Sequence, residues 1–164
     1  MEILSVVNMD DEVVGEAEHE EVYEKLLPHR IVHVLIFNEK NEMALQQRSK
    51  NKSFCPSHWS TAVGGHVRSG ESYEEAAMRE MREEIGVQPD LQFLYKDFYT
   101  DKRNLKKFLA IFKTFYSGPF RINPVEVERV EFFSIEKIQQ MIDGGENFHP
   151  ELLFLLKKHF QIKA

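Results

Sequence analysis

The sequence predicts an α/β or α+β domain in which helices pack around a mixed sheet. Short apolar and β-branched runs bounded by turn residues recur along the chain, and later segments show helical spacing of apolar residues. The 164 residues are 42% hydrophobic and 29% charged, which fits one globular domain over residues 1–164. A domain of this length can bury about 70% of the surface that its unfolded chain exposes.

The amino-terminal half favours strands. Two short apolar runs separated by turn residues, Ile3–Val7 and Val13–Gly15, indicate a pair of strands. The acidic segment from Glu16 to Leu27 has little periodicity, so it is either a loop or a short helix. The β-branched run Ile31–Phe37 predicts a buried strand, and Asn38–Asn41 predicts a turn that makes a hairpin with Glu42–Arg48.

The carboxyl-terminal half combines strands with two helices. Three further strands are expected at Leu91–Tyr99, Lys107–Tyr116 and Val127–Phe133. Ser134 is placed to begin a helix over Ile135–Ile142, and Pro150 begins a last helix that ends near Phe160. The polar and basic run from Thr100 to Lys107 is either a loop over a pocket or a surface turn.

Composition excludes several classes of function. A net charge of −6 argues against nucleic acid as the main partner, because phosphate backbones attract clustered Lys and Arg. No apolar run approaches the length that spans a membrane. The single cysteine, Cys55, excludes an intrachain disulfide, and with no signal-like amino terminus it suggests the reducing cytoplasm. The chain is expected to be a monomer or a homodimer.

One helix carries most of the chemical information. Ser72 and Glu75 form a capping-box pattern and Gly86 is a suitable stop, so the sequence predicts a helix over Tyr73–Ile85. At about 100° per residue, Glu80, Glu83 and Glu84 fall within one sector of this helix. The adjacent sector holds the apolar residues that would face the core: Ala77, Met78, Met81 and Ile85.

Three neighbouring carboxylates have two interpretations. A glutamate-rich helix face is commonly just solvated, and like charges at these spacings cost a few tenths of a kcal/mol per pair. A hard divalent cation reverses that cost, since Mg²⁺ prefers a few carboxylates together with substrate phosphates. The spacing decides in favour of a metal site, because residues 65–87 satisfy every fixed position of the pattern G-x5-E-x7-R-E-U-x-E-E-x-G-U. In this pattern x is any residue and U is a bulky aliphatic residue. At ordinary residue frequencies, a chain would match this pattern by chance on the order of once in ten million chains.

This segment resembles the complete signature of the Nudix hydrolase superfamily. The resemblance implies a Nudix-type α/β/α sandwich with a mixed central sheet, and Mg²⁺-dependent hydrolysis of a small-molecule diphosphate, for which Mn²⁺ can substitute. It implies Glu80, Glu83, Glu84 and the carbonyl of Gly64 as metal ligands. Glu71 and Arg79 would form a supporting salt bridge. Gly65 and Gly70 would allow backbone turns that a Cβ atom hinders.

Residues outside this segment resemble the branch that contains isopentenyl-diphosphate isomerase and its hydrolase-like relatives. The matching segments are Pro28–Arg30, Gln46–Lys50, His58–Thr61 and Gly64–His66. The isomerase's catalytic cysteine aligns with Gly64. Of its three histidine and two glutamate ligands, His29 and His66 are matched, whereas the others fall at or near Val22, Leu105 and Lys107. The resemblance therefore favours hydrolysis, with an isomerase-like enzyme or a catalytically silent ligand-binding domain as alternatives.

The remaining candidates are weaker. Hydrolysis needs a general base. The resemblance points to Glu126, whose alternative interpretation is an exposed loop carboxylate. It also points to a glutamate of the signature segment, above all Glu83. Arg48, Lys50 and Lys52, of which the first two are the main candidates, could contact substrate phosphates or could be a solvated hairpin end. The substrate itself stays open among nucleoside diphosphate derivatives and other small organic diphosphates.

Overall fold

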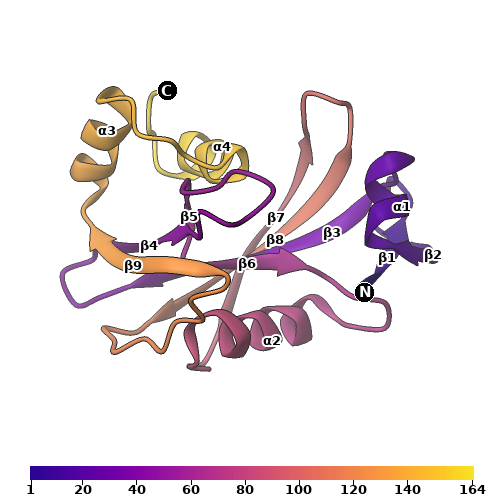
Figure 1. The fold of residues 1–164 in the computed structure, drawn as a ribbon, viewed down its shortest axis with the longest axis horizontal. Coiled ribbons are helices and arrows are strands. Elements are labelled where there is room, and N and C mark those ends of the chain that lie inside the picture. Colours follow the sequence, from indigo (N-terminus) through magenta and orange to yellow (C-terminus); the bar gives the residue numbers. More distant parts are fainter.

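The computed structural model describes residues 1–164 and contains nine strands and four helices (Figure 1). The strands are β1 Ile3–Val7, β2 Val13–Glu18, β3 His29–Phe37, β4 Met43–Arg48, β5 Trp59–Thr61, β6 Val63–His66, β7 Gln92–Thr100, β8 Lys106–Phe115 and β9 Val127–Phe133. The helices are α1 His19–Glu24, α2 Tyr73–Ile85, α3 Ile135–Asp143 and α4 Pro150–His159.

Strand β3 is the centre of one mixed sheet. It pairs in parallel with β8 and antiparallel with β1 and β6. The outer strands extend the sheet on both sides, β7 beyond β8 and β2 beyond β1, while β5 and β9 flank β4. Helix α2 covers one side of this sheet and α4 the other, with α3 beside α4 (Figure 1). The arrangement is the expected α/β/α sandwich.

Alternate residues of β3 explain the two layers. Val32, Val34 and Ile36 pack with the α2 residues Ala77 and Met81. Residues of the opposite parity pack against α3 and α4: Ile31, Leu35 and Phe37 contact a cluster that includes Ile138, Leu152 and Leu156. A strand buried on both faces needs a near-continuous apolar run, and this is the pattern from which β3 was predicted.

The predicted hairpin after β3 is wrong in extent. Strands β3 and β4 share one residue pair next to the turn, Phe37 with Met43, and then separate. Beyond that point β4 pairs with β5 and β9, which lie elsewhere in the sequence. Local turn chemistry predicts that two strands are joined, but long-range packing determines how far they stay paired.

Other elements agree with the sequence to within a few residues. Helix α2 has the predicted bounds, and the segment Glu16 to Leu27 divides into the end of β2 and the short helix α1. Strands β5 and β6 were not predicted, because they are short and rich in glycine and hydroxyl side chains. No helix here combines the length and the apolar character that crossing a membrane requires.

Candidate active site

Helix α2 is fixed at both ends by the residues that predicted it. The Ser72 hydroxyl accepts a hydrogen bond from the backbone N–H of Glu75, and the Glu75 carboxylate accepts one from the N–H of Ser72, each at 3.1 Å. At the other end Gly86 has a φ of 71°, and its N–H donates to the carbonyl of Met81. These two caps fix the residues at which the helix begins and ends, and they thereby help to position its carboxylates beside strand β6.

Strand β6 approaches α2 at its glycines. In register with β3, Gly64 lies opposite His33 and Gly65 opposite Val32. A Cβ atom on Gly65 would lie 2.4 Å from the carboxylate of Glu80, so this position requires glycine because of close packing. The predicted turn role is wrong for Gly65, which lies in a strand, whereas Gly70 does adopt a left-handed φ of 83°.

The three predicted carboxylates differ in burial. Glu80 and Glu84 are buried, whereas the side chain of Glu83 is 42% exposed. Glu84 accepts a hydrogen bond from Gln46 Nε2 at 2.7 Å. Burial, followed by hydrogen bonding and repulsion from Glu80, raises the pKa of Glu84 well above the usual carboxyl range. Two neighbouring buried carboxylates are a donor set that suits a hard divalent cation.

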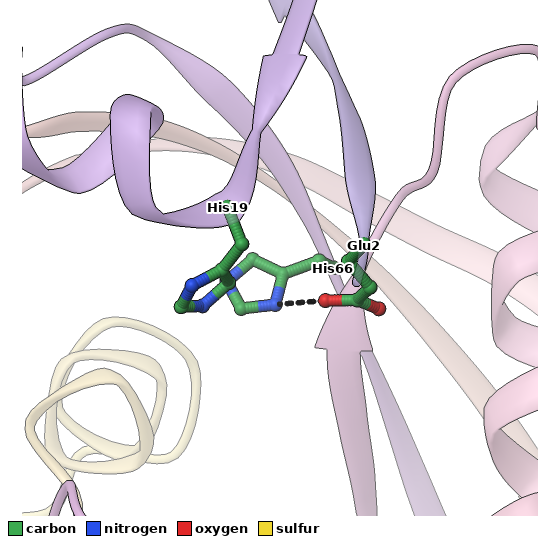
Figure 2. A group of neighbouring side chains, drawn as sticks. All are labelled: Glu2, His19 and His66. Carbon is green, nitrogen blue, oxygen red and sulfur yellow. Dashed lines mark ion pairs between the residues drawn. The ribbon is translucent and has the colours of Figure 1, made fainter.

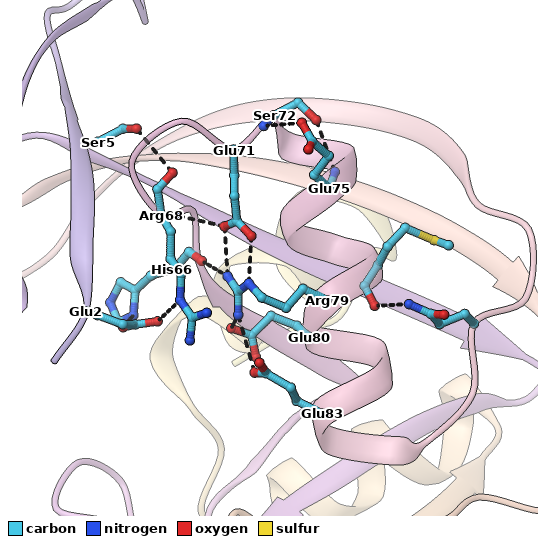
Figure 3. Close-up of polar contacts among 12 residues, drawn as sticks. Glu2, Ser5, His66, Arg68, Glu71, Ser72, Glu75, Arg79, Glu80 and Glu83 are labelled. Carbon is cyan, nitrogen blue, oxygen red and sulfur yellow. Dashed lines mark hydrogen bonds and ion pairs between the residues drawn. The ribbon is translucent and has the colours of Figure 1, made fainter.

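Arg79 joins the acidic groups to their surroundings (Figure 3). Its guanidinium donates to Glu71 at 2.6 Å, to Glu80 at 2.7 Å and to Glu83 at 3.3 Å. A further bond of 3.0 Å runs to the carbonyl of His66 on β6. Burial opposes the charge on Glu71, but hydrogen bonding from Arg79 outweighs it and lowers the pKa of Glu71. The predicted Glu71–Arg79 contact is thus present, within a wider network that orients Glu80 and Glu83.

These elements border one polar cavity of about 680 Å³. One part of its wall is acidic and contains Glu80, Glu83, Glu84 and Glu126, with Gly64 beside them. Cationic side chains line the same cavity: Arg48, Lys52, Arg68, Arg103 and Lys107. A cavity with carboxylates for a cation and with cations for an anion suits a phosphorylated molecule bound through a metal.

The other residues predicted for the site, Arg48, Lys50 and Glu126, differ in their positions relative to the cavity. Arg48 lines the cavity, where backbone carbonyls of Phe54 and Cys55 accept hydrogen bonds from its guanidinium. Lys50 is exposed and does not line the cavity, but Lys52 does. Lys52 forms an ion pair with Glu126, whose side chain is 42% exposed.

A buried ionic group in the cavity wall was not predicted. Glu151 of α4 accepts hydrogen bonds from Lys107 of β8 and from His33 of β3, each at 2.9 Å. Burial would raise the pKa of Glu151, but the Lys107 charge and the His33 hydrogen bond outweigh it and hold that pKa well below normal. The sequence signal was a histidine within the apolar run of β3, although its partners lie too far along the chain to be inferred.

The layered fold and the acidic helix beside a polar cavity define a class of α/β/α hydrolase domain. A family model described as the NUDIX domain matches residues 27–156, and the chain belongs to the Nudix family as a Nudix-type hydrolase. This family acts on pyrophosphate-containing compounds.

Three similar proteins illustrate the relationship. The Nudix hydrolase lin0387 of Listeria innocua is 34% identical over 85% of this chain and 83% of its own. The crystal structure of DR0079 from Deinococcus radiodurans superposes with a TM-score of 0.84 at 28% identity, covering 96% of this chain and 98% of that one. Isopentenyl-diphosphate Delta-isomerase 1 of Photorhabdus laumondii is 32% identical over 80% of this chain and 81% of its own.

Proposed function

We propose that the protein hydrolyses the diphosphate linkage of a nucleoside diphosphate derivative or a similar small organic diphosphate, with Mg²⁺ bound by Glu80, Glu83, Glu84 and the carbonyl of Gly64. The observation that carries the proposal is the convergence of the three α2 carboxylates on a cavity that also presents cationic side chains. Mn²⁺, which also accepts oxygen ligands, is expected to substitute.

The bound cation would polarise the phosphoryl oxygens and lower the pKa of a coordinated water. The chain's own residues bind and orient. Arg48, Lys52, Arg103 and Lys107 line the cavity wall where substrate phosphates would carry negative charge. Arg79 fixes Glu80 and Glu83 through its planar guanidinium, so these carboxylates need little rearrangement before they act.

A general base must accept the proton of the attacking water, and two carboxylates are candidates. Glu83 lines the cavity and its side chain is 42% exposed. Glu126 lies on the same cavity, where its carboxylate forms an ion pair with Lys52. The pH–rate profiles of Glu83→Gln and Glu126→Gln distinguish the two candidate bases. Loss of the base removes the fall in rate at acidic pH that protonation of the base causes.

The relationship to the isomerase gives a second candidate function, since His29 and His66 are present in the fold. Gly64, however, provides no side chain that could protonate a substrate. A panel of nucleoside di- and triphosphates, nucleotide sugars, dinucleotides, coenzyme A and isopentenyl diphosphate, each with Mg²⁺, tests both functions and the silent-domain alternative. Hydrolytic phosphate-containing products support our proposal. Dimethylallyl diphosphate as the sole product, or binding without any turnover, would refute it.

A further inference from the structure

Glu2, His19 and His66 form a cluster in the wall of the same cavity, apart from the α2 carboxylates. Glu2 immediately precedes β1, His19 begins α1 and His66 ends β6, so the cluster joins three separate segments (Figure 2). One ligand atom from each side chain lies within 4.8 Å of the other two. The histidine rings are nearly perpendicular, with centroids 4.9 Å apart.

These spacings are close to those around a metal ion. With zinc–ligand distances of about 2.0 to 2.1 Å, the ligands of a tetrahedral site lie about 3.3 Å apart. Glu2 Oε1 and His66 Nδ1 are already 3.5 Å apart. The spacings between ligand atoms would have to shrink by at most about 1.5 Å, which side-chain rotation achieves at partly exposed positions.

The electrostatic state of the cluster also suits a cation. Glu2 contributes one carboxylate to the cluster, beside the imidazoles of His19 and His66. Nearby cationic groups have partners of their own: Lys107 pairs with Glu151, Arg103 with Asp101, and Arg68 with the second oxygen of Glu2.

Two neighbouring residues give independent support. The Tyr23 hydroxyl lies 2.8 Å from His66 Nε2, a contact that orients the ring so that Nδ1 faces Glu2. His29 is fully buried, and its Nδ1 lies 2.9 Å from the carbonyl of Leu27, which leaves Nε2 as an unprotonated acceptor. That Nε2 atom has no hydrogen-bond partner, and its ring lies 5.6 Å from the His66 ring. An orphaned acceptor beside the cluster is what a cation, or a water bound to it, would satisfy.

We propose that Glu2, His19 and His66 bind one divalent cation of the zinc class at a site separate from the α2 carboxylates. Two imidazoles and one carboxylate favour Zn²⁺ over Mg²⁺, and three protein ligands leave a fourth position for water or a ligand in the cavity. His66 matches one ligand position of the isomerase, whereas Glu2 and His19 match none, so the cluster shares a single position with that metal site.

The test is a calorimetric titration of tag-free protein with Zn²⁺ in a saturating excess of Mg²⁺ and without substrate. We expect one Zn²⁺ per chain, with affinity lowered at least tenfold by Glu2→Gln and, separately, by His19→Gln. His58→Gln is the matched histidine control, since the His58 side chain bonds only to the Pro56 carbonyl, and Glu83→Gln is the control for the α2 carboxylates. Neither control should change the affinity for Zn²⁺.

Absorption of bound Co²⁺ identifies the ligands independently of affinity. Wild type should show the visible bands of a tetrahedral ion, and both Glu2→Gln and His19→Gln should lose them. Neither side chain is buried, so both variants are expected to fold, which melting curves in EDTA establish. Zinc binding that is lost in Glu83→Gln but kept in the other two variants would overturn the proposal. Absence of zinc binding under Mg²⁺ would overturn it as well.

Because no substrate is present, the outcome is independent of whether the protein hydrolyses diphosphates.

Discussion

Gly65 of β6 lies directly against the carboxylate of Glu80 on α2, so that a Cβ atom at Gly65 would be 2.4 Å from Glu80 Oε1. Arg79 donates a hydrogen bond of 2.7 Å to the same oxygen of this carboxylate. The position of Glu80 is therefore set by a strand backbone and by a guanidinium. A small substitution on the strand should therefore displace Glu80 and disturb the proposed metal site without replacing any metal ligand.

Gly65→Ala is expected to displace Glu80 and to lower both Mg²⁺ affinity and turnover about tenfold or more. The backbone of Gly65 does not have the left-handed φ that alanine resists, so the effect is steric. Gly15→Ala is the matched control, because a Cβ atom there meets nothing within 4 Å. Steady-state kinetics at several Mg²⁺ concentrations measure the effect. Equal activity in the two variants would contradict the packing argument.

Glu83→Gln should lower turnover about a hundredfold, since it removes a proposed metal ligand and a candidate base. The melting temperature should change little, because this side chain is 42% exposed. Glu74→Gln, an exposed substitution in the first turn of the same helix, should retain full activity. Near-normal turnover of Glu83→Gln would refute the site assignment.

The purified protein should not isomerise isopentenyl diphosphate, because Gly64 stands where the isomerase has its cysteine. The buried Lys107 pairs with Glu151 and occupies a position near which the isomerase places a ligand. Incubation with isopentenyl diphosphate and Mg²⁺, followed by chromatography of the products, is the measurement. Dimethylallyl diphosphate formed at an enzymatic rate would reverse the choice between the two reactions.

Metal-free Glu84→Gln should be about 0.3 to 1 kcal/mol more stable than metal-free wild type near neutral pH, or about 1 to 4 °C in melting temperature. Folding raises the pKa of Glu84, so wild type keeps its full stability below the unfolded pKa and loses some as pH rises through the folded pKa. The advantage of the variant should therefore grow with pH and vanish in mild acid. Melting curves in EDTA across this range measure it.

Saturating Mg²⁺ should reverse that order. Wild type gains about 1.4 kcal/mol at ten times Kd, whereas the variant lacks a proposed ligand and gains less. An equal gain in both proteins would mean that Glu84 does not contact the cation.

The sequence predicted those parts of the site that depend on local spacing. Helix α2, its capping box and the shared face of Glu80, Glu83 and Glu84 follow from residues a few positions apart, and the structure has each of them. The burial of both faces of the sheet beneath helices was likewise predictable from the apolar run of β3.

Features that depend on distant contacts were missed or misjudged. The ion group of Lys107, His33 and Glu151 joins two strands and a helix. The cluster of Glu2, His19 and His66 joins three segments whose proximity no local pattern encodes. Lys50 does not line the cavity although Arg48 and Lys52 do, because spacing along a loop does not show which side chain turns into a cavity.

The most direct test of the proposed function is hydrolysis in water enriched in ¹⁸O, followed by ³¹P nuclear magnetic resonance of the products. With the best substrate of the panel and Mg²⁺, we predict one ¹⁸O atom in a phosphate-containing product, no reaction in EDTA, and recovery when Mg²⁺ is restored in excess. Turnover that persists in EDTA, or products without ¹⁸O, would contradict metal-assisted attack of water at the α2 carboxylates.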